Sequence, residues 1–473
     1  MLDIQKNLSK RFYALLSLPS TAMGFALSVQ ISALSWILTT QYGLDIHEVG
    51  LVWAAGPIAG ILGQVIIGIV SDNVWFWNGR RRPFILIGGV LAGLMLLALP
   101  NIDIVSQSLG IEGILAIAIA IALTLDLSIN ISFNPTRSII ADVTPEGEKR
   151  TLGYTWMQTI SGSFGVLAYA IGAVWGNYVL IYFGAALVLV LSLIPPFFIT
   201  EPEELPKSDH AEQQGALSFK DIMINIKPLW GFIIYDIYAM ARQLSGAEVS
   251  HYYVELICAI LTVIFVVQTI LAKEENKTEQ EAGLVGFRKI LAAHSFSWIG
   301  IQTMFVFIFA FLQDKMAGIE DGELGQIISI SFLILSAVAA ILPAILLEPM
   351  AKKIGRVKVH TWCIASMAMG YLAVALFGDS IYVLYVLMAI LGIGWSAVIS
   401  LVFAIMSEKI DQNKMGMYMG LFNLSVVIPQ LLVSLGIGLF ISQTDDKSAI
   451  FYLCAISLAL SALCWSQVKE HKK

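Results

Sequence analysis

A polar stripe inside an apolar stretch is the first feature of this sequence that could do chemistry. The segment LTLDLSINISFNPTRSIIAD, residues 123–142, follows the unbroken apolar run GILAIAIAIA. At about 100° per residue, Asp126, Asn130, Asn134 and Arg137 fall on one face of a helix, over roughly 16 Å. A charged side chain inside a membrane costs about 3 kcal/mol or more, so it usually faces a cavity and has a function. A desolvated Asp126 favours its neutral form and can therefore take up and release a proton.

Two other interpretations of the stripe stay open. Asp126 could pair with polar neighbours to pack helices. Arg137 could donate hydrogen bonds to a substrate and act as a charge partner of Asp126, or it could anchor the helix by reaching outward to the cytoplasmic surface.

Composition indicates a membrane protein with many spans. Hydrophobic residues make up 58% of the 473 positions and charged residues 13%, whereas soluble proteins have about 25% charged residues. A spanning helix needs about 20 mainly apolar residues, because lipid offers no partner to the backbone N–H and C=O groups. Strands of alternating polarity are absent from the sequence.

Apolar runs between charged residues predict an all-α membrane protein with about 14 transmembrane segments. Six segments precede residue 200 and six follow residue 290, and a shorter pair at 229–243 and 251–272 lies between these two sets. We therefore expect an N-terminal six-helix half at 1–199, a linker with an extra hydrophobic hairpin at 200–290, and a C-terminal six-helix half at 291–473. The predicted spans are 12–38, 48–71, 83–100, 113–140, 152–175, 178–199, 229–243, 251–272, 291–312, 325–348, 359–377, 381–406, 416–440 and 449–468.

The placement of basic residues predicts the orientation, since Lys and Arg near helix ends favour the cytoplasmic side. With the N-terminus inside, 24 of the 28 Lys and Arg are cytoplasmic; the other four are Arg242, Lys315, Lys447 and Arg137. We expect a multi-pass protein of the inner (plasma) membrane with both termini in the cytoplasm. No cleavable signal peptide is evident.

An internal repeat appears in two polar loops. Asp72 and Gly79 are seven residues apart in GIVSDNVWFWNGRRRPF, as are Glu348 and Gly355 in LLEPMAKKIGRVKVH, and an Arg follows each Gly. An acid at a helix end, a turn-forming Gly and following cations can bridge neighbouring helices, which predicts a gate. Ordinary charges that set topology are the alternative. The predicted gating residues are Asp72, Gly79, Arg80, Arg81, Arg82, Asp142, Glu348 and Arg356.

Amides and aromatic rings elsewhere are weaker candidates for substrate contacts. Amides in apolar helices could hydrogen-bond a substrate or bridge two helices, and tryptophan faces could stack on a substrate ring or simply pack. The candidates are Gln64, Gln158, Gln302, Asn423, Gln430, Trp53, Trp298 and, in a loop, His47. The four cysteines lack metal-ligand spacing, and no basic stripe suited to nucleic acid occurs, so we expect no metal, no cofactor and no nucleic acid partner.

Several of these segments resemble the major facilitator superfamily, and in particular its sucrose and glycoside cation symporters. The similar stretches are HEVGLVWAAGPIAGILGQVIIGIVSDN, NGRRRPFI, LDLSIN with PTRSIIAD, the pair WM at 156–157, and GLFNLSVVIPQLLVSLG. The fourth helix of plant sucrose transporters resembles LDxANN followed by QGPxRALLAD. Five matching residues are Asp126, Asn130, Pro135, Arg137 and Asp142, whereas Ile129, Phe133 and Asn134 differ. The resemblance implies two six-helix halves and a proton-coupling role for Asp126.

These features predict a proton-coupled symporter that imports a sugar, a disaccharide or glycoside, by alternating access. The expected partners are the sugar, the proton or sodium, and the lipid bilayer, and we expect a monomer. A sodium-coupled glycoside symporter is the nearest alternative. A non-transporting sugar sensor would need a signalling domain, and the polar tails are too short for one. No nucleophile elbow, phosphate loop or metal motif indicates an enzyme.

Overall fold

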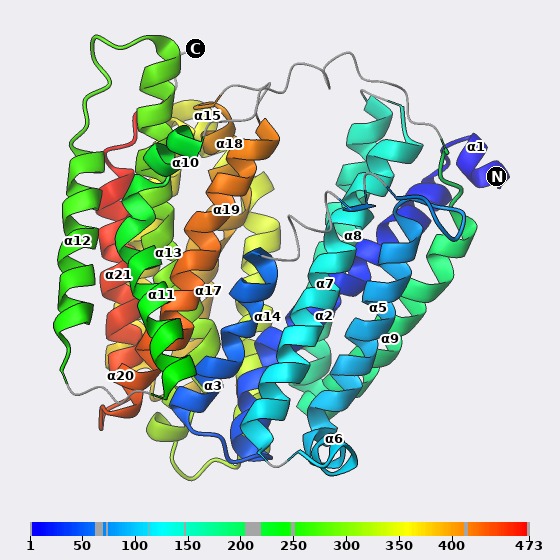
Figure 1. Cartoon of the computed structure of the whole chain (residues 1–473), viewed down its shortest axis with the longest axis horizontal. Helices are drawn as coiled ribbons and strands as arrows, with labels where there is room; N and C mark the ends of the chain where they lie inside the picture. The colour runs from blue at the N-terminus through cyan, green and yellow to red at the C-terminus, as the bar shows by residue number, and fades with distance from the viewer. Residues whose placement is uncertain are drawn as a thin grey trace. The chain divides into compact units, whose positions relative to one another are not determined.

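The computed structural model describes residues 2–61, 70–71, 74–111, 113–145, 148–203, 219–246, 251–410 and 415–470. All regular secondary structure in these ranges is helical, as predicted, apart from one isolated β-bridge between Phe76 and Gly79 (Figure 1). The chain forms two compact units: unit 1 is Met1–Lys207 with Gly318–Leu333, and unit 2 is Ser208–Ala317 with Ile334–Lys473. The predicted division at residues 199 and 290 stays a prediction.

Two helices of unit 1, α2 and α3, begin at capping side chains. Ser9 accepts a hydrogen bond from the Phe12 N–H at 3.3 Å and begins α2. Asp45 and Glu48 form a capping box that begins α3, and such caps satisfy N–H groups that have no partner within the helix. The helices are α1 (Asp3–Lys6), α2 (Lys10–Thr40), α3 (Ile46–Trp53), α5 (Arg82–Ala98), η1 (Leu99–Asn101), α6 (Ile102–Leu109), α7 (Ile114–Val143), α8 (Glu148–Trp175) and α9 (Asn177–Phe198).

Small residues allow α5 to lie closely against α7 and α9 (Figure 1). A Cβ at Gly88 would lie 2.4 Å from Ser132 Oγ of α7, and one at Gly89 would lie 2.0 Å from Ser192 Cβ of α9. Close backbone approach between small residues is a common way for helices to associate in lipid. The GG pair of α5 thus fixes the positions of the two helices beside it.

Unit 2 contains the remaining helices and the C-terminal part of α14, whose residues up to Leu333 belong to unit 1. A capping box of Thr278 and Glu281 begins α13, and α13 and α16 both pack on α21. The helices are α10 (Phe219–Asn225), η3 (Lys227–Leu229), α11 (Trp230–Ser245), α12 (Tyr253–Ile270), α13 (Glu279–Lys315), α14 (Asp321–Leu342), the π-helix η4 (Pro343–Leu347), α15 (Glu348–Ile354), α16 (Arg356–Phe377), α17 (Ile381–Ser400), α18 (Val402–Ser407), α19 (Met415–Leu432), the π-helix η6 (Val433–Ile437), α20 (Gly438–Ser442) and α21 (Ala449–Trp465).

Helices α11 and α12 lie where the sequence predicts the interposed hairpin. The helices pack on each other, and a Cβ at Gly231 would lie 2.0 Å from Thr262 Oγ1. Gly246, with φ of +65°, ends α11. The sixteen residues of α11 span about 24 Å, less than the roughly 30 Å of a hydrocarbon core. Residues 247–250 of the predicted turn lie outside the described residues.

The helices fit a multi-pass membrane protein. Eleven helices among the described residues are long and apolar enough to cross a bilayer, and Ile46–Ile61 and Ala449–Trp465 are shorter apolar helices. Helix α11 belongs to neither group. The number of 14 segments therefore stays a prediction.

The close approach at Gly89 leads to a stability prediction. Gly89→Ala should destabilise the protein by about 1–3 kcal/mol, because the added methyl group overlaps Ser192. Thermal unfolding of the detergent-purified chain measures this. Gly162→Ala is the matched control, since a Cβ at Gly162 of α8 meets no atom within 4 Å, and it should leave the midpoint unchanged or raise it. Equal midpoints for the two variants would contradict the packing argument.

Candidate functional site

Asp126 lies buried in the middle of α7, and its described partner is an amide. Its side chain is among the buried polar groups, with the residue 5% exposed. Gln30 Nε2 of α2 lies 3.2 Å from Oδ1 and 3.0 Å from Oδ2, and a Cβ at Gly56 would lie 3.5 Å from Oδ2. A Gln amide can donate to a carboxylate through its nitrogen or accept from a carboxylic acid through its oxygen. Gln30 can therefore serve both protonation states of Asp126.

The other residues of the stripe follow Asp126 along α7 and become progressively more exposed. Asn130 and Asn134 are half-buried, and Arg137 is exposed. Asn130 Nδ2 donates to the backbone oxygen of Asp126 at 2.8 Å. Arg137 Cζ lies 4.2 Å from the centre of the Phe133 ring. The predicted face thus exists, running from a buried acid to an accessible cation.

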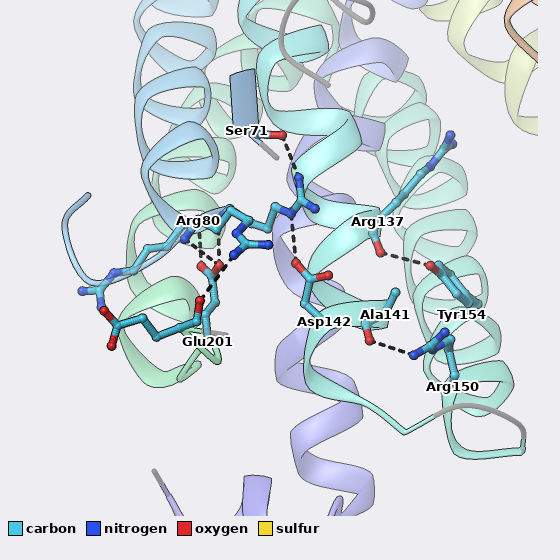
Figure 2. Close-up of polar contacts among 11 residues, drawn as sticks. Ser71, Arg80, Arg137, Ala141, Asp142, Arg150, Tyr154 and Glu201 are labelled. Carbon is cyan, nitrogen blue, oxygen red and sulfur yellow. Dashed lines mark hydrogen bonds and ion pairs between the residues drawn. The ribbon is translucent and has the colours of Figure 1, made fainter. Parts of the chain in front are cut away.

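The structure does not bring Arg137 to Asp126. No ion pair of Arg137 occurs among the residues that the structure describes, and eleven residues of helix separate the two side chains by about 16 Å. In Figure 2 the Arg137 side chain points away from Asp142, while its backbone oxygen accepts a hydrogen bond from Tyr154 Oη at 3.3 Å. Arg137 therefore does not neutralise Asp126 in this structure.

A buried charge cluster holds the polar loop of unit 1. The Glu201 carboxylate, just after α9, accepts from the backbone N–H groups of Arg80, Arg81 and Arg82 at 2.8, 2.7 and 2.7 Å (Figure 2). These groups form the N-terminal end of α5, where a carboxylate also interacts favourably with the helix dipole.

Arg81 links this loop to α7. Its Nε lies 2.9 Å from Asp142 Oδ2, with the side chains only 7% and 11% exposed, and its Nη1 donates to Ser71 Oγ at 2.8 Å. Arg82 lies over the ring of Phe197, 4.4 Å from its centre. A Cβ at Gly79 would lie 2.6 Å from Glu201 Oε1, so only glycine leaves room there for the carboxylate. Predicted residues Gly79, Arg80, Arg81, Arg82 and Asp142 thus belong to one cluster.

Unit 2 contains the same arrangement with different acids. The Glu470 carboxylate, after α21, accepts from the N–H groups of Arg356 and Val357 at 2.9 and 3.0 Å, at the start of α16. The Arg356 guanidinium pairs with Glu408, which follows α18. Glu348, the predicted counterpart of Asp72, is exposed and pairs with Lys352 at 2.7 Å. In both units, therefore, a Glu accepts hydrogen bonds from the first N–H groups of a helix, and an Arg beside these groups forms an ion pair.

The remaining candidates divide between the units. In unit 1, Trp53 is buried and donates to Ser35 Oγ at 2.8 Å, His47 is half-buried in the first turn of α3, and Gln158 of α8 is exposed. In unit 2, Gln430 Nε2 of α19 donates to Gln302 Oε1 of α13 at 3.1 Å, and Asn423 is half-buried. Candidates Gln64 and Asp72 lie outside the described residues.

Trp298 belongs to an aromatic cluster in unit 2. Its indole N–H donates to His294 Nε2 at 2.9 Å, and its ring meets Trp395 edge-on, with centres 6.1 Å apart. His294 is 2% exposed and stacks on Phe422 at 4.8 Å. The histidine thus fixes the orientation of an indole that remains partly accessible.

Sequence reasoning missed several of these partners. Gln30 stands alone in the apolar run FALSVQISAL, which is a usable signal for a functional amide. Glu201 and Glu470 follow the predicted spans 178–199 and 449–468, in TEPEE and VKEHKK, so their shared position was a signal as well. The other residues missed are Ser71, His294, Trp395 and Glu408.

Comparison with known proteins identifies relatives over most of the chain. The family model described as Major Facilitator Superfamily matches residues 16–434 and 299–473. Sucrose transport protein SUC4 of Arabidopsis thaliana is 23% identical, over 92% of this chain and 85% of its own length. Sucrose transport protein SUT5 of Oryza sativa subsp. indica is 40% identical over 18% of this chain and 15% of its own. The general alpha-glucoside permease of Schizosaccharomyces pombe is 30% identical over 33% of this chain and 31% of its own.

Solved structures share the fold at low sequence identity. The nucleoside transporter NupG matches with a TM-score of 0.61 and 14% identity, over 97% of this chain and all of that one. An auto-inhibited POT family peptide transporter matches with a TM-score of 0.67 and 12% identity, over 98% of both chains. These proteins carry different substrates on one fold, so the fold alone does not identify the cargo.

The three hydrogen bonds of Glu201 predict a large effect of losing its charge. Glu201→Gln should destabilise the protein by about 1–3 kcal/mol, because a neutral amide replaces a carboxylate that accepts hydrogen bonds from three backbone N–H groups. Glu203→Gln, two residues later and exposed, is the control and should change little. Thermal unfolding compares them. If both variants unfolded at the wild-type midpoint, the Glu201 hydrogen bonds would not contribute to stability.

Proposed function

Because the chain belongs to the Major Facilitator Superfamily, a family of membrane transporters, we propose that it is a proton-coupled symporter that imports a sugar of the disaccharide or glycoside class. It is a multi-pass integral membrane protein and not an enzyme. The observation that carries the proposal is Asp126, a carboxyl buried in α7 with an uncharged amide as its described partner. The named relatives, sucrose transporters and an alpha-glucoside permease, favour the sugar class.

Proton coupling follows from the surroundings of Asp126. A buried carboxylate next to an amide gains less than one next to a guanidinium, so its neutral form remains accessible. Binding a proton removes the charge that would oppose movement through the membrane. One charge moved through 100 mV supplies about 2.3 kcal/mol, enough for roughly fifty-fold accumulation of the sugar.

Substrate contacts are proposed for each unit separately. In unit 1, Asn130, Asn134 and Arg137 continue the stripe outward from Asp126 and offer donors and acceptors for sugar hydroxyls. In unit 2, the Gln302–Gln430 pair offers further amides, and the partly accessible Trp298 offers an aromatic face for the apolar side of a sugar ring. The weaker candidates His47, Trp53, Gln64, Gln158 and Asn423 remain proposals at the same site.

The two charge clusters are proposed as gating elements. Each ties the start of one helix to the ends of two others, α5 to α7 and α9 in unit 1, and α16 to α18 and α21 in unit 2. A cluster of this kind holds helix ends in one discrete arrangement, and breaking its ion pair releases them. Arg81 with Asp142, and Arg356 with Glu408, are the pairs to break.

Substituting Asp126 tests the coupling. In proteoliposomes, Asp126→Asn should abolish sugar accumulation driven by a proton gradient and leave sugar counterflow measurable, because a permanently neutral side chain mimics the protonated state. The exposed Asp103→Asn of α6 is the control and should accumulate sugar normally. Accumulation that persists in Asp126→Asn, or that follows an imposed sodium gradient in the wild type, would refute proton coupling at this residue.

The substrate class is tested in the same vesicles by counterflow. A panel of disaccharides, glucosides and monosaccharides should contain at least one substrate, and Arg137→Gln should raise its half-saturation concentration about tenfold or more, as expected for losing a charged hydrogen bond. If every sugar fails while the purified protein is folded, the sugar assignment is incorrect.

We also propose 14 transmembrane segments with both termini in the cytoplasm and the α11–α12 turn outside, since basic residues flank the hairpin on its other side. A single cysteine at Ser245, the exposed last residue of α11, should react with a membrane-impermeant maleimide added to intact cells. A cysteine at Lys220 of α10 is the control and should react only after the membrane is opened. The reverse labelling pattern would overturn this topology.

A further inference from the structure

A long apolar groove runs along the hairpin of unit 2. Its volume is about 1040 Å³. Every third or fourth residue of α12 and the residue after its end, from Glu255 to Leu271, lines one wall, over roughly 24 Å. Leu453, Ser457, Leu460, Leu463 and Cys464 of α21 line it as well, as does Phe232 of α11. Pockets that bind small molecules measure about 300–1,000 Å³, so this groove is at the upper end of that range.

The groove has a buried floor and exposed rims. Cys258 and Phe232 are 3% and 5% exposed, whereas Val263 of α12 and Leu463 of α21 are 61% and 65% exposed. The exposed rims are apolar on two helices that belong to a membrane protein, so the groove opens towards lipid and not towards water. An empty apolar space forfeits the dispersion contacts of its lining atoms, which hydrocarbon chains can restore.

One end of the groove is polar. Arg242 of α11 and Glu255 of α12 pair there, with Nη1 and Oε1 3.4 Å apart and side chains 10% and 20% exposed. The second carboxylate oxygen, Glu255 Oε2, is buried and has no hydrogen-bond partner in the described part of the chain. Tyr252 Oη donates to Gln443 Oε1 at 3.2 Å beside them. This end therefore offers one cation and one unsatisfied carboxylate oxygen.

We propose that this groove binds a phospholipid with a phosphoethanolamine headgroup, its phosphate on Arg242, its ammonium on Glu255 Oε2 and an acyl chain along α12. The charges match, because the Arg–Glu pair is neutral as a whole and so is the headgroup. An ammonium donates hydrogen bonds that a quaternary choline cannot donate. An anionic headgroup without an amine would place a second negative charge beside Glu255.

The length of the groove also fits an acyl chain. One leaflet contributes about 15 Å of a roughly 30 Å hydrocarbon core, and the groove exceeds this depth. An acyl chain that enters at the Arg242 end can therefore lie in the groove, against α12, through the full depth of one leaflet. The site uses none of the residues proposed for sugar or proton binding, so the two proposals stand or fall separately.

Native mass spectrometry of the full chain tests the lipid site. The purified protein would be titrated with phosphatidylethanolamine, phosphatidylcholine and phosphatidylglycerol that carry the same palmitoyl and oleoyl chains. We expect one phosphatidylethanolamine to bind at least tenfold more tightly than either of the others. Phosphatidylglycerol or phosphatidylcholine binding as tightly as phosphatidylethanolamine would overturn the headgroup assignment.

Substitutions locate the bound lipid. Ala259→Trp fills the groove from α12 and should abolish this binding, whereas Ile260→Trp, on the same helix and outside the lining, should not. Leu460→Trp and Ile456→Trp form the equivalent pair on α21 and give the answer if one Ala259 variant does not fold. Glu255→Gln should reduce the preference over phosphatidylcholine to less than threefold. Equal binding by the filled variants and their controls would show that the groove is not the site.

Discussion

Hydrocarbon provides no hydrogen-bond partner, and every polar group of this chain that lies in a membrane must find its partner within the protein. The backbone meets this constraint by forming helices throughout the described ranges. The first N–H groups of a helix have no partner within the helix. At the start of α5 the carboxylate of Glu201 accepts three of them, and the position of α5 against α9 depends on that contact.

The same solution occurs in both units. Glu201 follows α9 and satisfies the start of α5, and Glu470 follows α21 and satisfies the start of α16. Arg81 pairs with Asp142 at the end of α7, and Arg356 pairs with Glu408 just after α18. Charges held in this way are close and directional, so they define one arrangement of helix ends, and the Arg81–Asp142 pair of unit 1 is also buried. A transporter that alternates between arrangements needs contacts of this kind, because two packed states must each be discrete.

Asp126 has a different kind of partner from these acids. Asp142 meets a guanidinium and Glu201 meets three N–H groups, whereas Asp126 meets a Gln amide. A carboxylate without a cation nearby is only weakly stabilised in its charged form. This contrast between the ion-paired or N–H-bound acids at the helix ends and the amide-bound acid in α7 is the basis of the proposed proton coupling.

The amino-acid sequence by itself determined the class of the protein, the helical segments, the hairpin and the polar face of α7, because spans of about 20 apolar residues and a 3.6-residue period are local properties. Only the tertiary structure decided that Gln30, 96 positions away, is the partner of Asp126. It likewise decided that Glu408, and not Glu348, pairs with Arg356. The partners of Asp126 and Arg356 depend on which helices pack side by side. That packing follows from the fit of side chains across the whole fold and not from any one segment.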